Sequence, residues 1–255
     1  MQLTNRLKKL IHGLADVKWR RREGLFIAEG TKCALDIAGI FRCRYLVATD
    51  EWFATHPFAA DGDTGIITAT KAEMREISTL TLAPPVIAVC EIPETLPFDP
   101  SVALGGLVVA LDCVQDPGNL GTIIRTCDWM GVEHILASKD TVDVFNPKTV
   151  QATMGAVARV RVHYVELPET LTAVSRAGAD VFGTFLDGDN LYSAELSSSG
   201  VIVMGNEGKG ISEDVSRLVG HRLLIPSYPP ERPTSESLNV ATATAVILSE
   251  FRRRL

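Results

Sequence analysis

The chain has 255 residues, of which 46% are hydrophobic and 22% are charged, and its formal net charge is −6. These values are ordinary for a globular protein of one large or two smaller domains, and we find no repeat or low-complexity tract. No apolar run reaches the ~18 residues of a membrane span, and the first ten residues lack the apolar core of a signal peptide. We therefore expect a cytoplasmic protein with no membrane partner.

The first part of the chain predicts a small alternating α/β unit. Leucines and isoleucines at helical spacing predict a helix over residues 3–14. The pattern then predicts strands at residues 26–28, 45–48 and 86–91 and helices at residues 31–38 and 72–79.

Basic residues are concentrated at the start of this unit, although the whole chain is acidic. Residues 1–32 contain eight lysines and arginines and three acidic residues, a net charge of +5, so the remaining chain carries −11. Arg20, Arg21 and Arg22 are consecutive within this stretch and are candidate phosphate contacts. A solvated amphipathic helix produces the same pattern, so both interpretations stay open.

A proline-rich stretch separates this unit from the rest of the chain. Residues 92–101 hold three prolines, which fix φ and remove hydrogen-bond donors, so the stretch is a poor helix or central strand. We therefore expect a linker at residues 93–104, between a first domain at residues 1–92 and a second at residues 105–255.

The second domain predicts a mostly parallel sheet covered on both faces. Apolar runs predict strands at residues 106–112, 134–137, 160–165, 180–185, 201–204 and 222–225. Helices are expected at residues 119–130, 146–157, 168–177, 212–218 and 238–253. Strand and helix alternation is typical of an α/β fold, in which ligands bind beyond the carboxyl ends of the strands.

Cysteine usage argues against a disulfide framework or a metal site. The five cysteines are Cys33, Cys43, Cys90, Cys113 and Cys127. Their number is odd and none forms a C-x-x-C pair, so we expect no zinc site and five free thiols in a reducing compartment.

Two nucleotide-binding signatures are absent from the second domain. Lys209 follows a glycine, but the next residue is not Ser or Thr, and no glycine stands five residues before Gly208, so this is not a P-loop. No G-x-G-x-x-G follows the first strand of the domain, which disfavours a Rossmann oxidoreductase. The glycines instead indicate sharp turns that let main chain approach a ligand closely.

Three later blocks carry the strongest signal, because the segments that contain them or lead to them begin where expected strands end. They read NLGTIIR at residues 119–125, MGNEGKGIS at residues 204–212 and SLNVATA at residues 237–243. In this order and at these separations they resemble the motifs of the SpoU/TrmH family, part of the SPOUT superfamily. Members transfer a methyl group from S-adenosylmethionine to a ribose 2′-OH in structured RNA.

The resemblance implies roles for individual residues. The expected catalytic residues are Asn119, Arg125, Glu207, Ser237 and Asn239. The expected cofactor-binding residues are Met204, Gly205, Asn206, Gly210, Ile225, Pro226 and Leu238. Arg125 is either the proton acceptor for the 2′-OH or a group that binds an adjacent phosphate and stabilises charge. Residues 227–236 form a longer, proline-rich connection than many relatives have, which leaves the cofactor contacts open.

The resemblance also implies a fold and partners. The matched domain of this family contains a deep C-terminal trefoil knot and dimerises, and an apolar stripe (Val240, Ala243, Val246, Ile247) on the last helix fits a homodimer. FIAEG at residues 26–30 is similar to the start of the family's substrate-binding domain, which resembles ribosomal protein L30e. We expect ribosomal RNA as substrate rather than transfer RNA. A non-catalytic RNA-binding protein of the same fold is the alternative.

Overall fold

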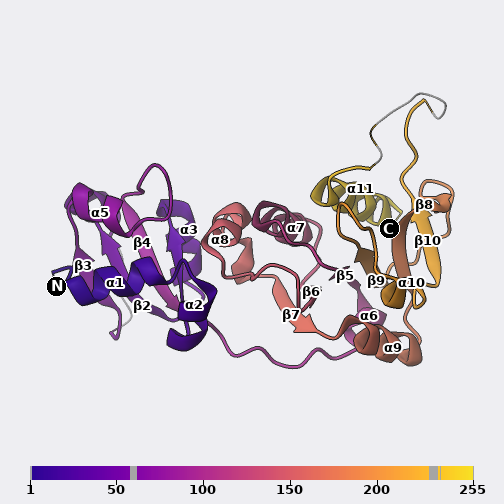
Figure 1. Ribbon diagram of the computed structural model, residues 1–255, viewed down its shortest axis with the longest axis horizontal. Helices are drawn as coiled ribbons and strands as arrows, with labels where there is room; N and C mark the ends of the chain where they lie inside the picture. The colour runs from indigo at the N-terminus through magenta and orange to yellow at the C-terminus, as the bar shows by residue number, and fades with distance from the viewer. Residues whose placement is uncertain (1, 58–61, 230–234, 236, 255) are drawn as a thin grey trace. The chain divides into compact units, whose positions relative to one another are not determined.

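The computed structural model (Figure 1) describes residues 2–57, 62–229, 235 and 237–254. It divides into two compact units: Met1–Glu94 together with Asp143–Ala158, and Thr95–Val142 together with Arg159–Leu255. The chain therefore passes from one unit to the other three times, and the expected linker lies at the first passage. Within the described ranges, we find no helix with the length and hydrophobicity that a bilayer crossing requires.

The first unit is built on a four-stranded mixed sheet in the order β1-β4-β2-β3. The strands are β1 (Leu25–Glu29), β2 (Cys43–Ala48), β3 (Gly65–Thr68) and β4 (Val86–Glu91); β4 runs antiparallel to β1 and β2, and β3 runs parallel to β2. The helices before α8 are α1 (Asn5–Gly13), α2 (Val17–Glu23), α3 (Thr31–Ala38), α4 (Asp50–Thr55) and α5 (Lys71–Ile77). The three strands and three helices expected here are confirmed.

The sequence analysis missed α2, α4 and β3, because each is short and lacks a long apolar period. The six residues of α4 begin at the cap Thr49, whose side chain accepts a hydrogen bond from the Trp52 amide at 3.3 Å. Helix α2 has the sequence VKWRRRE, in which charged residues outnumber apolar ones. Tertiary contacts, rather than local pattern, hold such segments in place.

Residues 143–158 belong to the first unit although they follow β6 in the chain. They form α8 (Pro147–Thr153) and the short 3-10 helix η1 (Ala156–Ala158). The single helix expected at residues 146–157 is interrupted, because Met154 (φ 51°) and Gly155 (φ 90°) adopt left-handed backbone conformations. The ring of Phe145 lies against Phe26, with ring centroids 4.6 Å apart.

A buried ion pair fastens this segment to α2. Arg20 is 1% exposed; its Nε and Nη2 donate to Asp143 Oδ2 at 2.9 and 2.6 Å, and its Nη1 donates to the carbonyls of Leu14 and Ala15. This burial removes Arg20 from the phosphate-binding surface that the sequence indicated. Arg21 and Arg22 are exposed.

The second unit is a six-stranded sheet in the order β10-β8-β9-β5-β6-β7, and every neighbouring pair is parallel. The strands are β5 (Leu107–Leu111), β6 (His134–Ser138), β7 (Arg161–Val165), β8 (Val181–Asn190), β9 (Gly200–Met204) and β10 (His221–Leu224). The six expected strands and the parallel α/β sheet are confirmed. The helices are α6 (Val102–Gly105), α7 (Pro117–Trp129), α9 (Leu167–Ala177), α10 (Glu213–Ser216) and α11 (Val240–Arg253).

Helices cover both faces of this sheet. Side chains alternate across a strand, and Val108 and Val201 pack with Ala103 of α6, Leu171 of α9 and Val215 of α10. On the opposite face, α7 and α11 contact each other (Figure 1). Phe182 of β8 packs edge-to-face against Phe251 of α11 there, with ring centroids 5.0 Å apart. Two residues of the expected apolar stripe of α11, Val240 and Ile247, are therefore buried in its own core, and the other two, Ala243 and Val246, are half-buried.

Two stacked histidines join β6 to β7 and to the stretch before α6. His163 Nδ1 lies 3.3 Å from the Leu96 carbonyl oxygen, and His163 Nε2 lies 3.0 Å from His134 Nδ1. Because a carbonyl oxygen only accepts, His163 Nδ1 carries its proton and His134 Nδ1 donates to His163 Nε2. Phe98 packs edge-on against both rings. The arrangement requires His163 to be neutral, because its Nε2 must accept a hydrogen bond.

The Arg20–Asp143 pair predicts a large stability effect. Arg20→Ala leaves a carboxylate and two backbone carbonyls without their donor, so the free energy of unfolding of the first unit should fall by about 3–5 kcal/mol. Arg21→Ala is the matched control, and its effect should stay within about 0.5 kcal/mol because Arg21 is exposed. Urea denaturation measures both, and equal effects would contradict the role given to Arg20.

The histidine pair predicts a pH dependence of stability. Burial lowers the pKa of both His134 and His163. The positive charge of Arg161 lowers the pKa of His134 further and outweighs the opposing effect of Glu133. His134 and Arg161 lower the pKa of His163 further. The folded state therefore binds fewer protons than the unfolded state. The contribution of the histidine pair to the free energy of unfolding is complete above the unfolded pKa of about 6.5, and it is lost as pH falls below that value. His134→Gln should flatten the decline in urea midpoint measured between about pH 8 and pH 5; an unchanged decline would refute this assignment.

Candidate functional site

The candidate site lies at the carboxyl edge of the parallel sheet. Strands β5, β9 and β10 end at Leu111, Met204 and Leu224, and the segments that follow them carry the first two blocks and the approach to the third. In a parallel sheet these ends share one edge, which is where ligands bind in open α/β folds. The convergence expected from the sequence is confirmed.

A polar network at this edge joins the three blocks. Asn119 Nδ2 donates to Glu207 Oε1 at 2.9 Å, and Asn239 Nδ2 donates to the same oxygen at 2.6 Å and to Asn119 Oδ1 at 2.9 Å. The Val240 amide also donates to Glu207 Oε1, at 3.2 Å. Three segments of the chain that are remote in sequence, namely α7, the loop after β9 and the start of α11, are thereby held in one geometry.

Helix starts orient the two asparagines. Asn239 caps α11: its Oδ1 accepts from the amides of Ala241 and Thr242 at 3.0 and 3.2 Å. With its oxygen used in this way, Asn239 must direct its Nδ2 donors toward Glu207 and Asn119. Asn119 is held on the first turn of α7, where the cap Asp116 accepts its backbone amide at 2.7 Å.

The loop after β9 is shaped by Asn206 and two glycines. Asn206 and Gly210 exchange backbone hydrogen bonds at 2.9 and 2.8 Å. Asn206 Oδ1 accepts from the Gly208 and Lys209 amides, and its Nδ2 donates to the Cys113 carbonyl at 2.8 Å. A Cβ at Gly205 would lie 2.3 Å from the Gly210 carbonyl carbon, so no other residue fits there.

A pocket of about 740 Å³ lies beside this loop. Its volume falls within the range of small-molecule sites, roughly 300–1,000 Å³. The lining includes all seven expected cofactor-binding residues, which are Met204, Gly205, Asn206, Gly210, Ile225, Pro226 and Leu238, together with Glu207 and Ser237. Thr184, Phe185 and Leu186 of β8 also line it, and the sequence analysis missed them because β8 belongs to none of the three blocks.

Arg125 and Ser237 do not join the polar network. Arg125 is exposed on α7 and makes no hydrogen bond or ion pair with the residues that the structure describes. It follows Asn119 by six positions, which at 3.6 residues per turn places the two side chains on different faces of the helix. Ser237 is exposed on the segment before α11 and lines the pocket. The guanidinium of Arg125 is therefore available to a ligand.

Asp112 is a positioning residue that the sequence analysis did not assign. It directly follows β5 and is 7% exposed, and its Oδ2 accepts from the Ser212 amide at 2.7 Å. The bond joins the end of the second block, at Ser212, to the segment that leads from β5 to the first block. An acidic residue closing a fully apolar strand was the available signal. Burial raises the pKa of the neighbouring Cys113, so this thiol is not an activated nucleophile.

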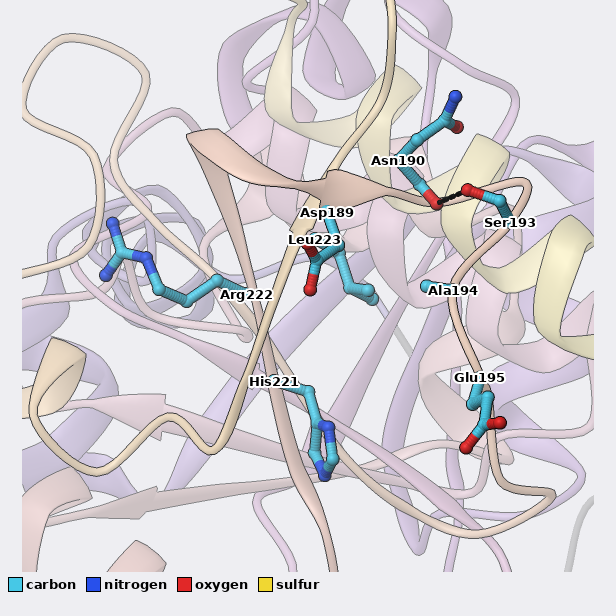
Figure 2. A pocket seen from close by; sticks show the side chains of 8 residues that line it. All are labelled: Asp189, Asn190, Ser193, Ala194, Glu195, His221, Arg222 and Leu223. Atoms are coloured by element: carbon cyan, nitrogen blue, oxygen red, sulfur yellow. Dashed lines mark hydrogen bonds between the residues drawn. The ribbon is translucent and has the colours of Figure 1, made fainter.

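Figure 2 shows a second, smaller hollow of about 410 Å³ at the edge strand β10 and its neighbour β8. It is lined by Asp189, Asn190, Ser193, Ala194, Glu195, His221, Arg222 and Leu223. The Arg222 side chain extends away from Ser193 and Glu195 (Figure 2), and its Nη2 donates to Asp187 at 2.6 Å. The hollow contains none of the expected site residues, so the site lies at the larger pocket.

Comparison with known proteins identifies relatives of the whole chain. The SpoU rRNA Methylase family model matches residues 106–249. The 23S rRNA (guanosine(2553)-2′-O)-methyltransferase RlmP of Bacillus subtilis is 34% identical over 66% of this chain, and the alignment spans 64% of its own length. An uncharacterised tRNA/rRNA methyltransferase of Synechocystis is 30% identical over 98% of this chain and 92% of its own.

Solved structures are similar over nearly the full length. A TrmH-family protein from Porphyromonas gingivalis superimposes with a TM-score of 0.89 at 39% identity, covering 99% of each chain. The AdoMet-bound rRNA methyltransferase from Sinorhizobium meliloti superimposes with a TM-score of 0.86 at 31% identity, covering 100% of this chain and 98% of that one. With the family match covering most of the second unit and all three blocks, this chain belongs to the SpoU rRNA methylase family.

Proposed function

We propose that the protein transfers a methyl group from S-adenosylmethionine to a ribose 2′-OH of ribosomal RNA in a reducing, cytoplasmic compartment. The observation that carries this proposal is the Asn119–Glu207–Asn239 network beside a pocket lined by all seven expected cofactor residues. RlmP is named as a 23S rRNA 2′-O-methyltransferase, and the Sinorhizobium meliloti structure is AdoMet-bound. The five free cysteines fit a reducing compartment.

The pocket residues fit the cofactor. Apolar side chains of Phe185, Leu186 and Ile225 offer contacts for an adenine ring, and the Gly205 and Gly210 backbone permits close approach of main-chain donors and acceptors. S-Adenosylmethionine supplies an electrophilic methyl group on a sulfonium sulfur. Glu207 lines the same pocket and accepts hydrogen bonds from Asn119 and Asn239. Its carboxylate therefore connects the cofactor pocket with the two asparagines that we assign to the ribose.

The protein's own residues then act on the 2′-OH. As the methyl group bonds to the 2′ oxygen, the hydroxyl must lose its proton. Arginine normally stays protonated, so we assign Arg125 to the adjacent phosphate, where its charge lowers the pKa of the 2′-OH and the phosphate accepts the proton. Asn119, Ser237 and Asn239 orient the ribose. Arg125 is suited to this role because it is exposed and unpaired among the described residues.

We further propose the finer architecture that the family resemblance implies. The first unit serves as an L30e-like RNA-binding domain, and the second contains the deep trefoil knot of SPOUT enzymes. The protein forms a homodimer through the outer face of α7. Trp129 at the end of that helix is 87% exposed, and contact with a second copy of the chain would bury its ring. This surface takes the place of the α11 stripe, in which Val240 and Ile247 are buried.

Replacement of Arg125 tests the catalytic assignment. Arg125→Ala should reduce methyl transfer by on the order of 100-fold or more, while S-adenosylmethionine affinity measured by calorimetry stays unchanged, because Arg125 does not line the pocket. Tritium transfer from labelled cofactor to ribosomal RNA provides the rate. Arg176→Ala, at an exposed position on α9, is the control. Near-normal turnover in Arg125→Ala would refute the role, and a wild-type protein that binds no cofactor would favour the non-catalytic alternative.

Light scattering tests the dimer. The wild-type protein should have the mass of two chains at micromolar concentration, and Trp129→Glu should have the mass of one, because a charge would be buried against the partner. Leu82→Glu is the control, since Leu82 is 87% exposed and lies in the other unit. A one-chain mass for the wild type would rule out the proposed assembly.

A further inference from the structure

Helix α2 carries an exposed stack of a tryptophan and an arginine. The guanidinium carbon of Arg22 lies 4.3 Å from the ring centroid of Trp19, three positions earlier on the same helix face. The indole is half-buried and packs against the end of α1, because a Cβ on Gly13 would lie 2.3 Å from Trp19 Cε3. Gly13 therefore contacts the Trp19 ring, and the Arg22 side chain, which is 60% exposed, also covers that ring.

The edge and the face of this guanidinium have different surroundings. Arg22 Nε donates to Glu23 Oε1 at 2.9 Å, and Nη2 lies 2.8 Å from the same oxygen. A phosphate that approached this edge would meet the carboxylate already bound there. The guanidinium carbon lies over the Trp19 ring, and 60% of the Arg22 side chain remains exposed. Glu23 therefore neutralises the charge of Arg22 locally, while the exposed part of the guanidinium remains available to a ligand.

Neighbouring charges and a rigid base complete the surface. Lys18 and Arg21 are exposed on the same helix and form no ion pair with described residues. Arg20, between them, is locked to Asp143 and to backbone carbonyls, so α2 presents these side chains from a fixed position. At about 100° per residue, Lys18 and Arg21 lie on the same side of the Trp19–Arg22 pair. A preorganised plane with two free cations beside it matches a nucleotide whose base stacks and whose neighbouring phosphates lie on that side.

We propose that α2 binds an unpaired nucleotide of the RNA by stacking its base on the exposed part of the Arg22 guanidinium, with Lys18 and Arg21 contacting the neighbouring phosphates. Bases within a duplex are stacked on their neighbours, so only a loop, bulge or single strand can supply this base. The inference rests on the proposed function in requiring an RNA ligand, and it narrows the substrate to RNA with an unpaired nucleotide at the first unit.

The test uses the full chain and a short single-stranded oligoribonucleotide that carries one 2-aminopurine, whose fluorescence is quenched on stacking. Arg22→Lys keeps the charge and removes the plane, and Trp19→Leu removes the support. Both should weaken single-strand binding by on the order of tenfold and reduce the quenching. A fully paired duplex of the same sequence should bind both variants as it binds the wild type.

Arg21→Gln is the matched control for charge. It should lower the slope of log affinity against log salt by about one and leave the quenching intact, whereas Arg22→Lys should leave the slope intact. Wild-type affinity and quenching in Arg22→Lys would overturn the proposal, as would an equal loss of duplex binding. Arg22→Lys settles the question if Trp19→Leu does not fold.

S-Adenosylmethionine affinity, measured by calorimetry on the same proteins, separates this proposal from the function. If the wild-type protein binds cofactor and methylates ribosomal RNA normally but does not quench the 2-aminopurine probe, only the proposed base stacking on Arg22 is overturned. Absent cofactor binding in a wild-type protein that still quenches the probe would overturn the enzymatic function alone.

Discussion

One carboxylate oxygen, Oε1 of Glu207, accepts hydrogen bonds from segments 88 and 32 residues away in the sequence. These bonds bring together α7, the loop after β9 and the start of α11. A carboxylate only accepts, and both asparagines direct NH₂ groups toward it, so the network has a single consistent arrangement of donors and acceptors. The candidate site depends on this arrangement, because each block alone is a turn or a helix start.

The parallel sheet makes that meeting possible. Its strands all point the same way, so the loops after β5, β9 and β10 emerge at one edge. Hydrogen bonds from backbone amides to side-chain oxygens, rather than packing of large side chains, then fix the loops. Asp112 binds the Ser212 amide, Asn206 binds Gly208 and Lys209, and Gly205 leaves room for the chain to pass. Rigid backbone at this edge gives the pocket its shape before any ligand binds.

Three consecutive arginines in α2 illustrate how position decides the role of a charge. Arg20 is buried and paired with Asp143, Arg21 is exposed, and the guanidinium carbon of Arg22 lies over the Trp19 ring. On a helix, consecutive side chains point about 100° apart, so one run of identical residues reaches core, solvent and an aromatic ring. Arg20 also secures residues 143–158 to the first unit. A basic run in a sequence therefore does not define a phosphate-binding surface by itself.

The sequence by itself determined the α/β alternation, the parallel sheet and the three motif blocks, because hydrophobic periodicity and strand-end motifs are local properties. It also indicated Asn119, Glu207 and Asn239. Only the tertiary structure decided that Arg125 stands apart from these three, since helix phase and exposure fix where a side chain points. It placed Arg20 in the core and residues 143–158 with the first unit, because burial of a charge and long-range packing depend on partners more than a hundred residues away.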